Sequence, residues 1–378
     1  MANTLTNVIP QLLAQGVATL RENSVMPRLV NSNYSALGAQ RGSTIDIPIP
    51  TAASVTAVTA ANVPPVNPNT DIVPDTVAIT LNNWNESDFT LTDSEIRQVL
   101  NGTIPMSAAE AIKALANQID SDLMSLYKTI PYYCGTPGVT PFSASTTEAT
   151  QARKILNNNA VPLTDRRFVM NPETEANALD LRAFQDMSFS GDASAIIDGK
   201  VNRKLGFDFF MDQNAPTHTN GTQNGAYTVN GVAALGAKTL TLQVGAGTAL
   251  IGDIFTIAGD TQPYVVTANC AGGAVPILFS PGLKIATAGG EAITFVGAAS
   301  GVFDHDLAFH RDAFAFVSRP LADEDGLGNI IESVIDPVSG IALRLEVSRE
   351  HKRTRYSFDI LYGFATVRQE MAVRIFGA

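Results

Sequence analysis

Apolar residues recur every three or four positions in one long stretch, which predicts an amphipathic helix over 107–128. Its apolar stripe consists of Ile112, Leu115, Ile119, Leu123 and Leu126. Ser107 and Glu110 have the spacing of a capping box, in which the hydroxyl and the carboxylate satisfy free backbone N–H groups at the helix start. The same periodicity predicts a shorter helix over 8–25 and another over 147–158.

Alternation of apolar and other residues predicts strands on both sides of a proline-rich segment. The isoleucines of TIDIPI, at 44–49, recur at every second position, and 76–84 follows the same period. The segment PPVNPNTDIVP, at 64–74, holds too many prolines for a helix and is expected to be the tip between the strands. We therefore expect an extended β-arm over 42–92, which carries acidic residues and no Lys or Arg. Such an arm buries little core of its own and needs a partner surface.

The composition changes sharply at residue 217. Between 217 and 300 only five residues are charged, and Gly, Thr, Ala and Val dominate. Short alternating runs are separated by glycine-rich turns, at 239–244, 254–259, 264–268 and 293–297. Short strands at this spacing predict a small β-barrel or sandwich, inserted at 217–303 between two segments that mix helix and strand.

The C-terminal part of the chain predicts long antiparallel strands. Within 341–375, apolar residues from Ile341 to Val347 alternate with polar ones, so that one face is apolar. Two earlier segments predict further strands, a buried one at 166–172 that ends at a helix start and another at 204–216. The expected fold class is therefore α+β with an all-β insertion.

The charge content narrows the possible functions. Only 16% of the residues are charged, against about 25% in typical domains, which favours a surface that meets other protein, although Ser, Thr, Asn and Gln can also cover it. The net charge of −11 excludes a molecule that neutralises phosphates over its whole surface. Cys134 and Cys270 lack metal-ligand spacing and are expected to be buried thiols of a reducing compartment. The N-terminus lacks a signal-peptide pattern and no stretch reaches 18 apolar residues, so a cytosol-like medium is expected.

Two histidines close in sequence raise the question of a metal or acid–base site. His305 and His310 lie among Asp304, Asp306 and Asp312. In a strand the two imidazoles point to opposite faces, and on a helix they lie about 140° apart, so they diverge in both cases. Asp306 and His310 can share a face, but one carboxylate–imidazole pair is not a site. Motifs for phosphate, dinucleotide, zinc and nucleophilic-serine sites are absent, so we expect no catalytic, cofactor-binding or metal-binding residue and no enzyme.

A basic run near the C-terminus has the charge opposite to that of the β-arm. In one interpretation it is a solvated strand edge. In the other it docks on the acidic arm of a neighbouring copy, and several pairs must act together because each exposed pair is worth about 0–1 kcal/mol. The residues expected at this intersubunit contact are Asp71, Asp75, Glu86, Asp88, Arg349, Lys352, Arg353 and Arg355.

The order of these parts resembles the major capsid (coat) proteins of tailed bacteriophages. ALGAQRGSTIDIPIP, at 36–50, resembles the end of their N-terminal arm and the start of their extended loop. SAAEAIKALANQIDSDLMSLY, at 107–127, is similar to their long spine helix, and VMNPETEANAL, at 169–179, resembles a strand that runs into an axial-domain helix. LAFHRDAFAFVSRPL, at 307–321, is similar to a strand late in these chains. The inserted β domain resembles that of short-tailed-phage capsid proteins.

This resemblance implies the tailed-phage major capsid fold, which herpesvirus capsid and encapsulin shells share. The parts that it implies, in chain order, are an N-terminal arm (1–41), an extended β-loop (42–92), a peripheral domain with the spine helix (93–144), the first part of an axial domain (145–216), an inserted β-barrel (217–303) and returning axial and peripheral strands (304–378).

The resemblance also implies a structural protein that assembles as hexamers and pentamers of an icosahedral shell around double-stranded DNA, with weak non-specific contact to the DNA. It implies a scaffolding protein and a portal protein as partners, no cofactor, no membrane, and a place in the virion capsid after assembly in the host cytoplasm. One alternative is an encapsulin-like compartment shell. Another is a carbohydrate-binding protein or enzyme, which is disfavoured because 217–303 holds no Trp and only Tyr227 and Tyr264.

Overall fold

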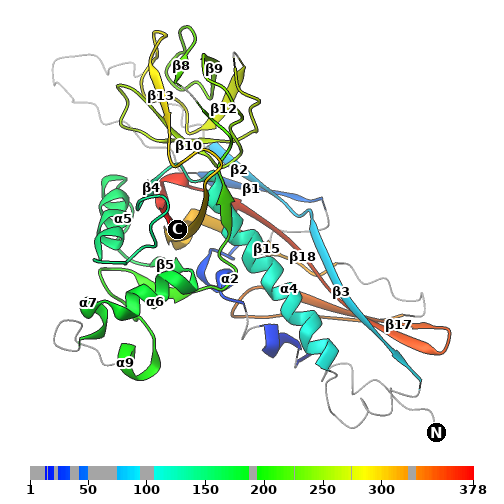
Figure 1. Ribbon diagram of the computed structural model, residues 1–378. Coiled ribbons are helices and arrows are strands. Elements are labelled where there is room, and N and C mark those ends of the chain that lie inside the picture. Colours follow the sequence, from blue (N-terminus) through cyan, green and yellow to red (C-terminus); the bar gives the residue numbers. More distant parts are fainter. Residues whose placement is uncertain are drawn as a thin grey trace, which may run out of the picture.

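The computed structural model describes residues 13–14, 16–20, 24–34, 42–49, 75–93, 106–186, 194–224, 226–273, 275–321 and 329–378. Figure 1 shows an elongated body that one long helix crosses, a group of short helices at one end of the body, and a β-barrel above it.

The long helix is α4 (Met106–Met124), which continues into the 3-10 turn η3 (Ser125–Thr129). Its predicted apolar stripe is buried in the largest hydrophobic core of the described chain. The predicted cap is wrong, because the helix already includes Met106 and Ser107 therefore lies inside it. Residues 13–14 and 16–20 of the predicted N-terminal helix are helical; the rest of that prediction lies largely outside the described residues.

One face of α4 packs on a five-stranded sheet. Its strands are β15 (Phe314–Ser318), β16 (Ile330–Ile335), β17 (Ala342–Glu350), β18 (Arg353–Thr366) and, paired with β18, β3 (Asn83–Thr92). β17 and β18 form the long antiparallel hairpin that the alternation in 341–375 predicts. It projects away from the body beside β3 (Figure 1).

The expected β-arm divides between two sheets. β1 (Thr44–Ile49) pairs with β2 (Asp75–Thr80) as an antiparallel hairpin, as predicted, and its tip lies outside the described residues. β3 then leaves this hairpin and pairs with β18 over ten residues of the same chain. Phe89 and Leu91 of β3 pack against the α4 core, so this part of the expected loop belongs to the body.

A six-stranded sheet supports the short helices. Its strands are β4 (Tyr133–Cys134), β19 (Ala372–Phe376), β14 (Val302–His310), β5 (Arg166–Met170), β6 (Asp208–Met211) and β7 (Thr217–Thr219). The helices are α5 (Thr147–Asn158), α6 (Pro172–Asp180), α7 (Arg182–Gln185) and α9 (Ser194–Asp198). The predicted strand at 166–172 ends where Asn171 caps α6, since its side chain accepts a hydrogen bond from Thr174 N at 2.6 Å.

The inserted segment forms a closed barrel. Its strands are β8 (Tyr227–Val229), β9 (Thr239–Gln243), β10 (Ile254–Ile257), β11 (Tyr264–Val266), β12 (Pro276–Ser280) and β13 (Ala292–Phe295). It buries a hydrophobic core of its own. β7 enters it and the start of β14 leaves it, and these two strands pair as an antiparallel stem.

Candidate functional site

The charged residues near the end of the β17–β18 hairpin pair mainly within the chain. Arg355 Nε donates a hydrogen bond to Asp88 Oδ2 at 2.8 Å, and its Nη2 donates to Glu86. Glu86 first, and then Asp88, raise the pKa of Arg355. Arg349 Nη2 donates to Asp93 Oδ2 at 2.9 Å. The pairing of β3 with β18 brings these acids and bases together.

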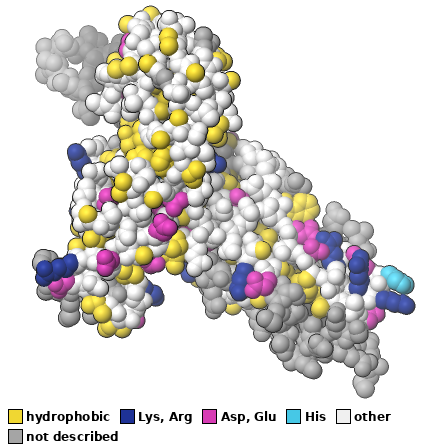
Figure 2. All heavy atoms as spheres, in the orientation of Figure 1, with side chains coloured by type: hydrophobic (Ala, Val, Ile, Leu, Met, Phe, Trp, Pro, Cys, Tyr) yellow, Lys and Arg dark blue, Asp and Glu magenta, His cyan; other side chains and the backbone are white. Residues whose placement is uncertain are grey.

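The other members of the expected intersubunit contact are dispersed. Asp71 lies outside the described residues, and Asp75 is exposed at the start of β2. Arg353 pairs with Glu350, and Lys352 is exposed at the turn of the hairpin with a φ of 56°. Figure 2 shows the hairpin end as a group of basic and acidic side chains, whereas the barrel shows few charges. Docking on a neighbour remains a prediction, and the pairing within the chain was not expected from the sequence.

The two histidines of β14 have separate surroundings, in keeping with the expected divergence. His305 stacks on Tyr127 with ring centroids 4.6 Å apart. His310 Nδ1 accepts a hydrogen bond from Asp312 N at 3.2 Å. Asp306 between them accepts from Asn171 N at 2.8 Å and from the Thr174 hydroxyl at 2.7 Å, and its burial raises its pKa to about 7.

A third histidine, distant in sequence, lies beside His305. His218 in β7 has its ring centroid 5.8 Å from that of His305. Its Nε2 lies 2.9 Å from Asp253 Oδ1 and its Nδ1 lies 3.0 Å from the Tyr127 hydroxyl. Because a carboxylate accepts, Nε2 is the donor to Asp253 and Nδ1 accepts from the Tyr127 hydroxyl. Asp253 Oδ2 also accepts from Gly221 N and Leu250 N.

We call Tyr127, His218, Asp253, His305 and Arg374 the barrel junction, because they connect η3, the stem, the barrel and β19. All five are buried. Burial first, then the positive charge of Arg374 and the nearby His218, lower the pKa of His305 well below its usual range. Burial lowers the pKa of Arg374 to about 9. Among the described residues, none of the Arg374 guanidinium nitrogens has a hydrogen-bond partner.

Tyr127, His218 and Asp253 are linked by hydrogen bonds in the way that residues of a proton relay are. Because these residues are buried, their role is structural. Tyr127 and Asp253 are each 1% exposed, so a substrate has no access to the His218 imidazole. The arrangement fixes the barrel on the body, because Asp253 comes from the barrel and Tyr127 comes from η3, which continues α4. Ile254, Phe303 and Phe376 form an apolar contact beside it.

Other chemistry has little support in the described residues. No group of three or more His, Cys, Asp or Glu side chains is placed to hold a metal ion in the part of the chain that the structure describes. Cys134 and Cys270 are free and buried, as expected, and burial raises the pKa of the Cys134 thiol. None of the described helices is both long and apolar enough to span a bilayer.

Comparison with known proteins gives a match in structure and none in sequence. No protein-family model and no curated protein sequence matches the chain. A solved structure of Mycobacterium phage Che8 aligns with a TM-score of 0.50 and 16% identity, over 93% of this chain and 90% of that one. The capsid structure of the cyanophage P-SCSP1u aligns with a TM-score of 0.48 and 14% identity, over 94% of this chain and 88% of that one. A virus-like particle from Pyrococcus furiosus aligns with a TM-score of 0.46 and 9% identity, over 97% and 98%.

The fold prediction is confirmed. The likeness to the Che8 structure spans nearly the whole of both chains, and this chain shares the mixed helix-and-sheet fold of that phage structure. At 16% identity this likeness establishes the fold alone.

Proposed function

We propose that this protein is the major capsid protein of a tailed double-stranded DNA bacteriophage. It assembles with copies of itself into hexamers and pentamers of an icosahedral shell that encloses the genome. The observation that carries the proposal is the whole-chain likeness of fold to the Che8 phage structure. The β17–β18 hairpin supports it, because this hairpin extends beyond the body and offers surface to neighbouring copies.

The proposed role is structural and not catalytic. A scaffolding protein and a portal protein are the further partners that we propose, and the contact with DNA is weak and non-specific, in keeping with a net charge of −11. The protein would reside in the virion capsid after assembly in the host bacterial cytoplasm.

Negative-stain electron microscopy tests the proposal. The protein is expressed alone and then together with a scaffolding candidate from the same genome. Closed shells, tubes or open sheets of capsomers are the expected result. A monodisperse monomer under both conditions would contradict the proposal. Nuclease-protected DNA inside shells from infected cells separates a phage capsid from an encapsulin-like compartment, in which enclosed protein is expected instead.

We also propose that the end of the β17–β18 hairpin docks on an acidic surface of a neighbouring copy. Lys352 is the most informative residue to substitute. Its neighbours Arg349, Arg353 and Arg355 all pair with carboxylates of their own chain, so a change at any of them would also break a pair within the subunit. Lys352→Glu should lower the yield of shells while the subunit still folds. Lys238→Glu, at an exposed lysine of the barrel, is the matched control. Equal shell yields from both variants would remove Lys352 from the contact.

A further inference from the structure

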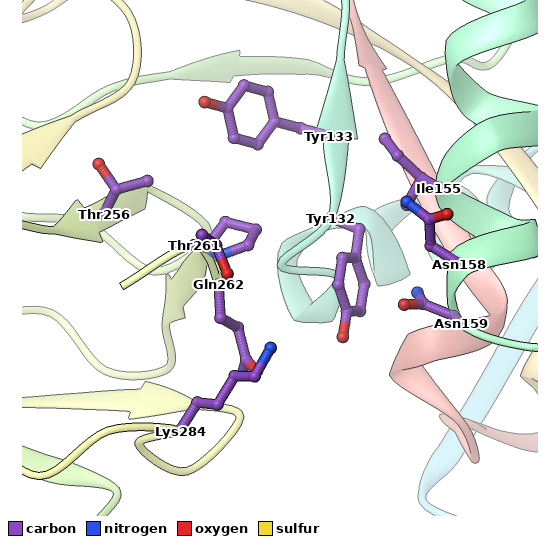
Figure 3. A pocket seen from close by; sticks show the side chains of 10 residues that line it. Tyr132, Tyr133, Ile155, Asn158, Asn159, Thr256, Thr261, Gln262 and Lys284 are labelled. Atoms are coloured by element: carbon purple, nitrogen blue, oxygen red, sulfur yellow. The ribbon is translucent and has the colours of Figure 1, made fainter. Parts of the chain in front are cut away.

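A cleft of about 510 Å³ lies between the barrel and the body. Such a volume falls within the range of small-molecule sites in proteins, about 300–1,000 Å³. The body contributes Tyr132, Tyr133 and the end of α5, and the barrel contributes residues of β10 and of the loop before β11. Figure 3 shows Tyr132 and Lys284 reaching toward the same space from opposite walls.

The lining is polar and aromatic with little charge. Its residues are Tyr132, Tyr133, Ile155, Asn158, Asn159, Thr256, Thr261, Gln262, Pro263 and Lys284. Lys284 is the one charged side chain among these described lining residues. Both tyrosines are half-buried, so each ring is held by the body while part of it faces the cleft.

Several polar groups of the lining are available to a ligand. Within the described chain, the side chains of Asn158, Gln262 and Lys284 and the Tyr132 hydroxyl have no hydrogen-bond partner. Asn159 Nδ2 already donates to the Glu370 carbonyl at 3.0 Å. Amides both donate and accept, and hydroxyl groups do so as well, so the free groups match a ligand rich in hydroxyls.

The barrel wall of the cleft is held in place from behind. Asp260 accepts hydrogen bonds from Gln262 N and from the Tyr264 hydroxyl, and that hydroxyl accepts from Lys284 N at 3.1 Å. Asp260 therefore holds Gln262, and the buried Tyr264, which donates to Asp260, holds Lys284. The barrel junction fixes the barrel on the body, so the two walls keep their separation. A cleft with fixed walls loses little entropy when a ligand binds.

The electrostatics of the cleft disfavour a phosphate or another strong anion. The C-terminal end of α5 lines it at Asn158, and a helix C-terminus carries a partial negative charge. Glu370 is close enough to raise the pKa of Tyr132, after the larger effect of burial. A single exposed lysine opposes these negative groups. An apolar peptide is also a poor match, because Ile155 and Pro263 are the only aliphatic side chains of the lining.

We propose that this cleft binds a neutral saccharide, whose C–H faces pack on the rings of Tyr132 and Tyr133 while its hydroxyls bond to the amides. The sequence disfavours a saccharide-binding insertion, because 217–303 holds only Tyr227 and Tyr264 as candidate aromatic platforms. In the structure both of these tyrosines are buried. The cleft draws its aromatic residues from outside the insertion. The proposal does not depend on the capsid function.

Saturation-transfer NMR and calorimetric titration of the purified chain test this proposal. The probes are a panel of neutral mono- and disaccharides based on glucose, galactose, mannose and N-acetylglucosamine, with inorganic phosphate and glucose 1-phosphate as anionic probes. Saturable binding of a neutral sugar, not weakened by added phosphate, is expected. Absence of saturable binding across the sugars, or binding of the phosphates alone, would overturn the proposal.

Variants locate the binding. Asn158→Ala combined with Gln262→Ala removes two exposed or half-exposed amides and should weaken the sugar affinity about tenfold or more, since two hydrogen bonds are lost. Asn230→Ala, at an exposed amide elsewhere on the barrel, is the matched control and should leave the affinity unchanged. Tyr132→Phe keeps the ring and should cost less than the double variant. An equal loss in the Asn230 variant would show that the sugar binds elsewhere and would refute the cleft.

Discussion

The buried ion pair between Arg344 and Asp359 should be one of the most sensitive points of the five-stranded sheet. The two residues lie directly opposite each other on β17 and β18. Arg344 Nε donates to both carboxylate oxygens of Asp359, at 2.9 and 3.1 Å, and its Nη2 also donates to Asp359. The Trp84 indole donates to the same carboxylate at 3.2 Å. The two side chains are only 10% and 5% exposed.

Asp359→Asn keeps the shape of this side chain and removes its charge. The Arg344 guanidinium then stays in a buried place without the carboxylate that compensates it. Loss of one partner of a buried pair costs about 3–5 kcal/mol, whereas replacement of both by apolar residues of similar volume is often neutral or stabilising. We therefore expect Asp359→Asn to lower the free energy of unfolding by about 3–5 kcal/mol, and Arg344→Met/Asp359→Leu to stay close to the wild type.

Urea unfolding of the dissociated subunit, followed by circular dichroism, measures these free energies. The matched control is Glu86→Gln, which removes one of the two exposed carboxylates that pair with Arg355. That pair is solvent-exposed, so its loss should cost about 0–1 kcal/mol. If Asp359→Asn costs no more than this control, or if Arg344→Met/Asp359→Leu is as destabilised as Asp359→Asn, the reasoning from burial is refuted.

Three further predictions concern buried titratable groups and one glycine. Burial raises the pKa of Asp120 from 3.8 to about 7, so its contribution to stability is present below about pH 4 and is lost as the pH rises toward 7; urea unfolding of Asp120→Asn should show a flatter pH profile there. His305 has a lowered pKa, so stability falls as the pH drops below about 6.5, and the melting temperature of His305→Phe should fall less between pH 7.5 and 5. A Cβ on Gly272 would lie 1.8 Å from the Gly247 carbonyl oxygen, so Gly272→Ala should expose the barrel to proteolysis, whereas Gly273→Ala, which has the same backbone strain at a φ of +80° but nothing within 4 Å, should expose it less.

The local elements could be predicted because their patterns repeat within a few residues. The α4 stripe and the alternation of 341–347 each report one buried face. The four predicted runs of the insertion correspond to the barrel strands β9, β10, β11 and β13, and of the six barrel strands only β8 and β12 are not predicted. The sequence does not distinguish a barrel from a sandwich. The structure does so, because β8 pairs with both β9 and β13 and thereby closes the ring of strands.

Long-range pairing could not be predicted in the same way. β3 reads NWNESDFTLT, and its alternate half-burial is visible in the sequence, but nothing local states that its partner begins at Arg353. From the sequence alone, the acidic residues of β3 are therefore predicted to lie on the surface of a projecting arm. The same limit applies to His218, which lies 87 positions before His305 in sequence and within ring contact of it in space. The opposite charges of the two segments indicate that the acidic strand and the basic strand pair with each other. They do not indicate whether the two strands belong to the same chain or to two neighbouring copies.

The barrel junction bears on how the insertion contributes to the molecule. A module joined by two linkers alone could rotate freely, and its junction would be solvated. Here the Arg374 guanidinium is buried without a hydrogen-bond partner among the described residues, which is costly wherever the group stays dry. The arrangement persists because Asp253 and its three donors, together with the apolar contact of Ile254 and Phe376, over-determine one orientation. A barrel held in one orientation gives the cleft beside it fixed walls, so changes at the junction should alter sugar binding without touching any residue of the lining.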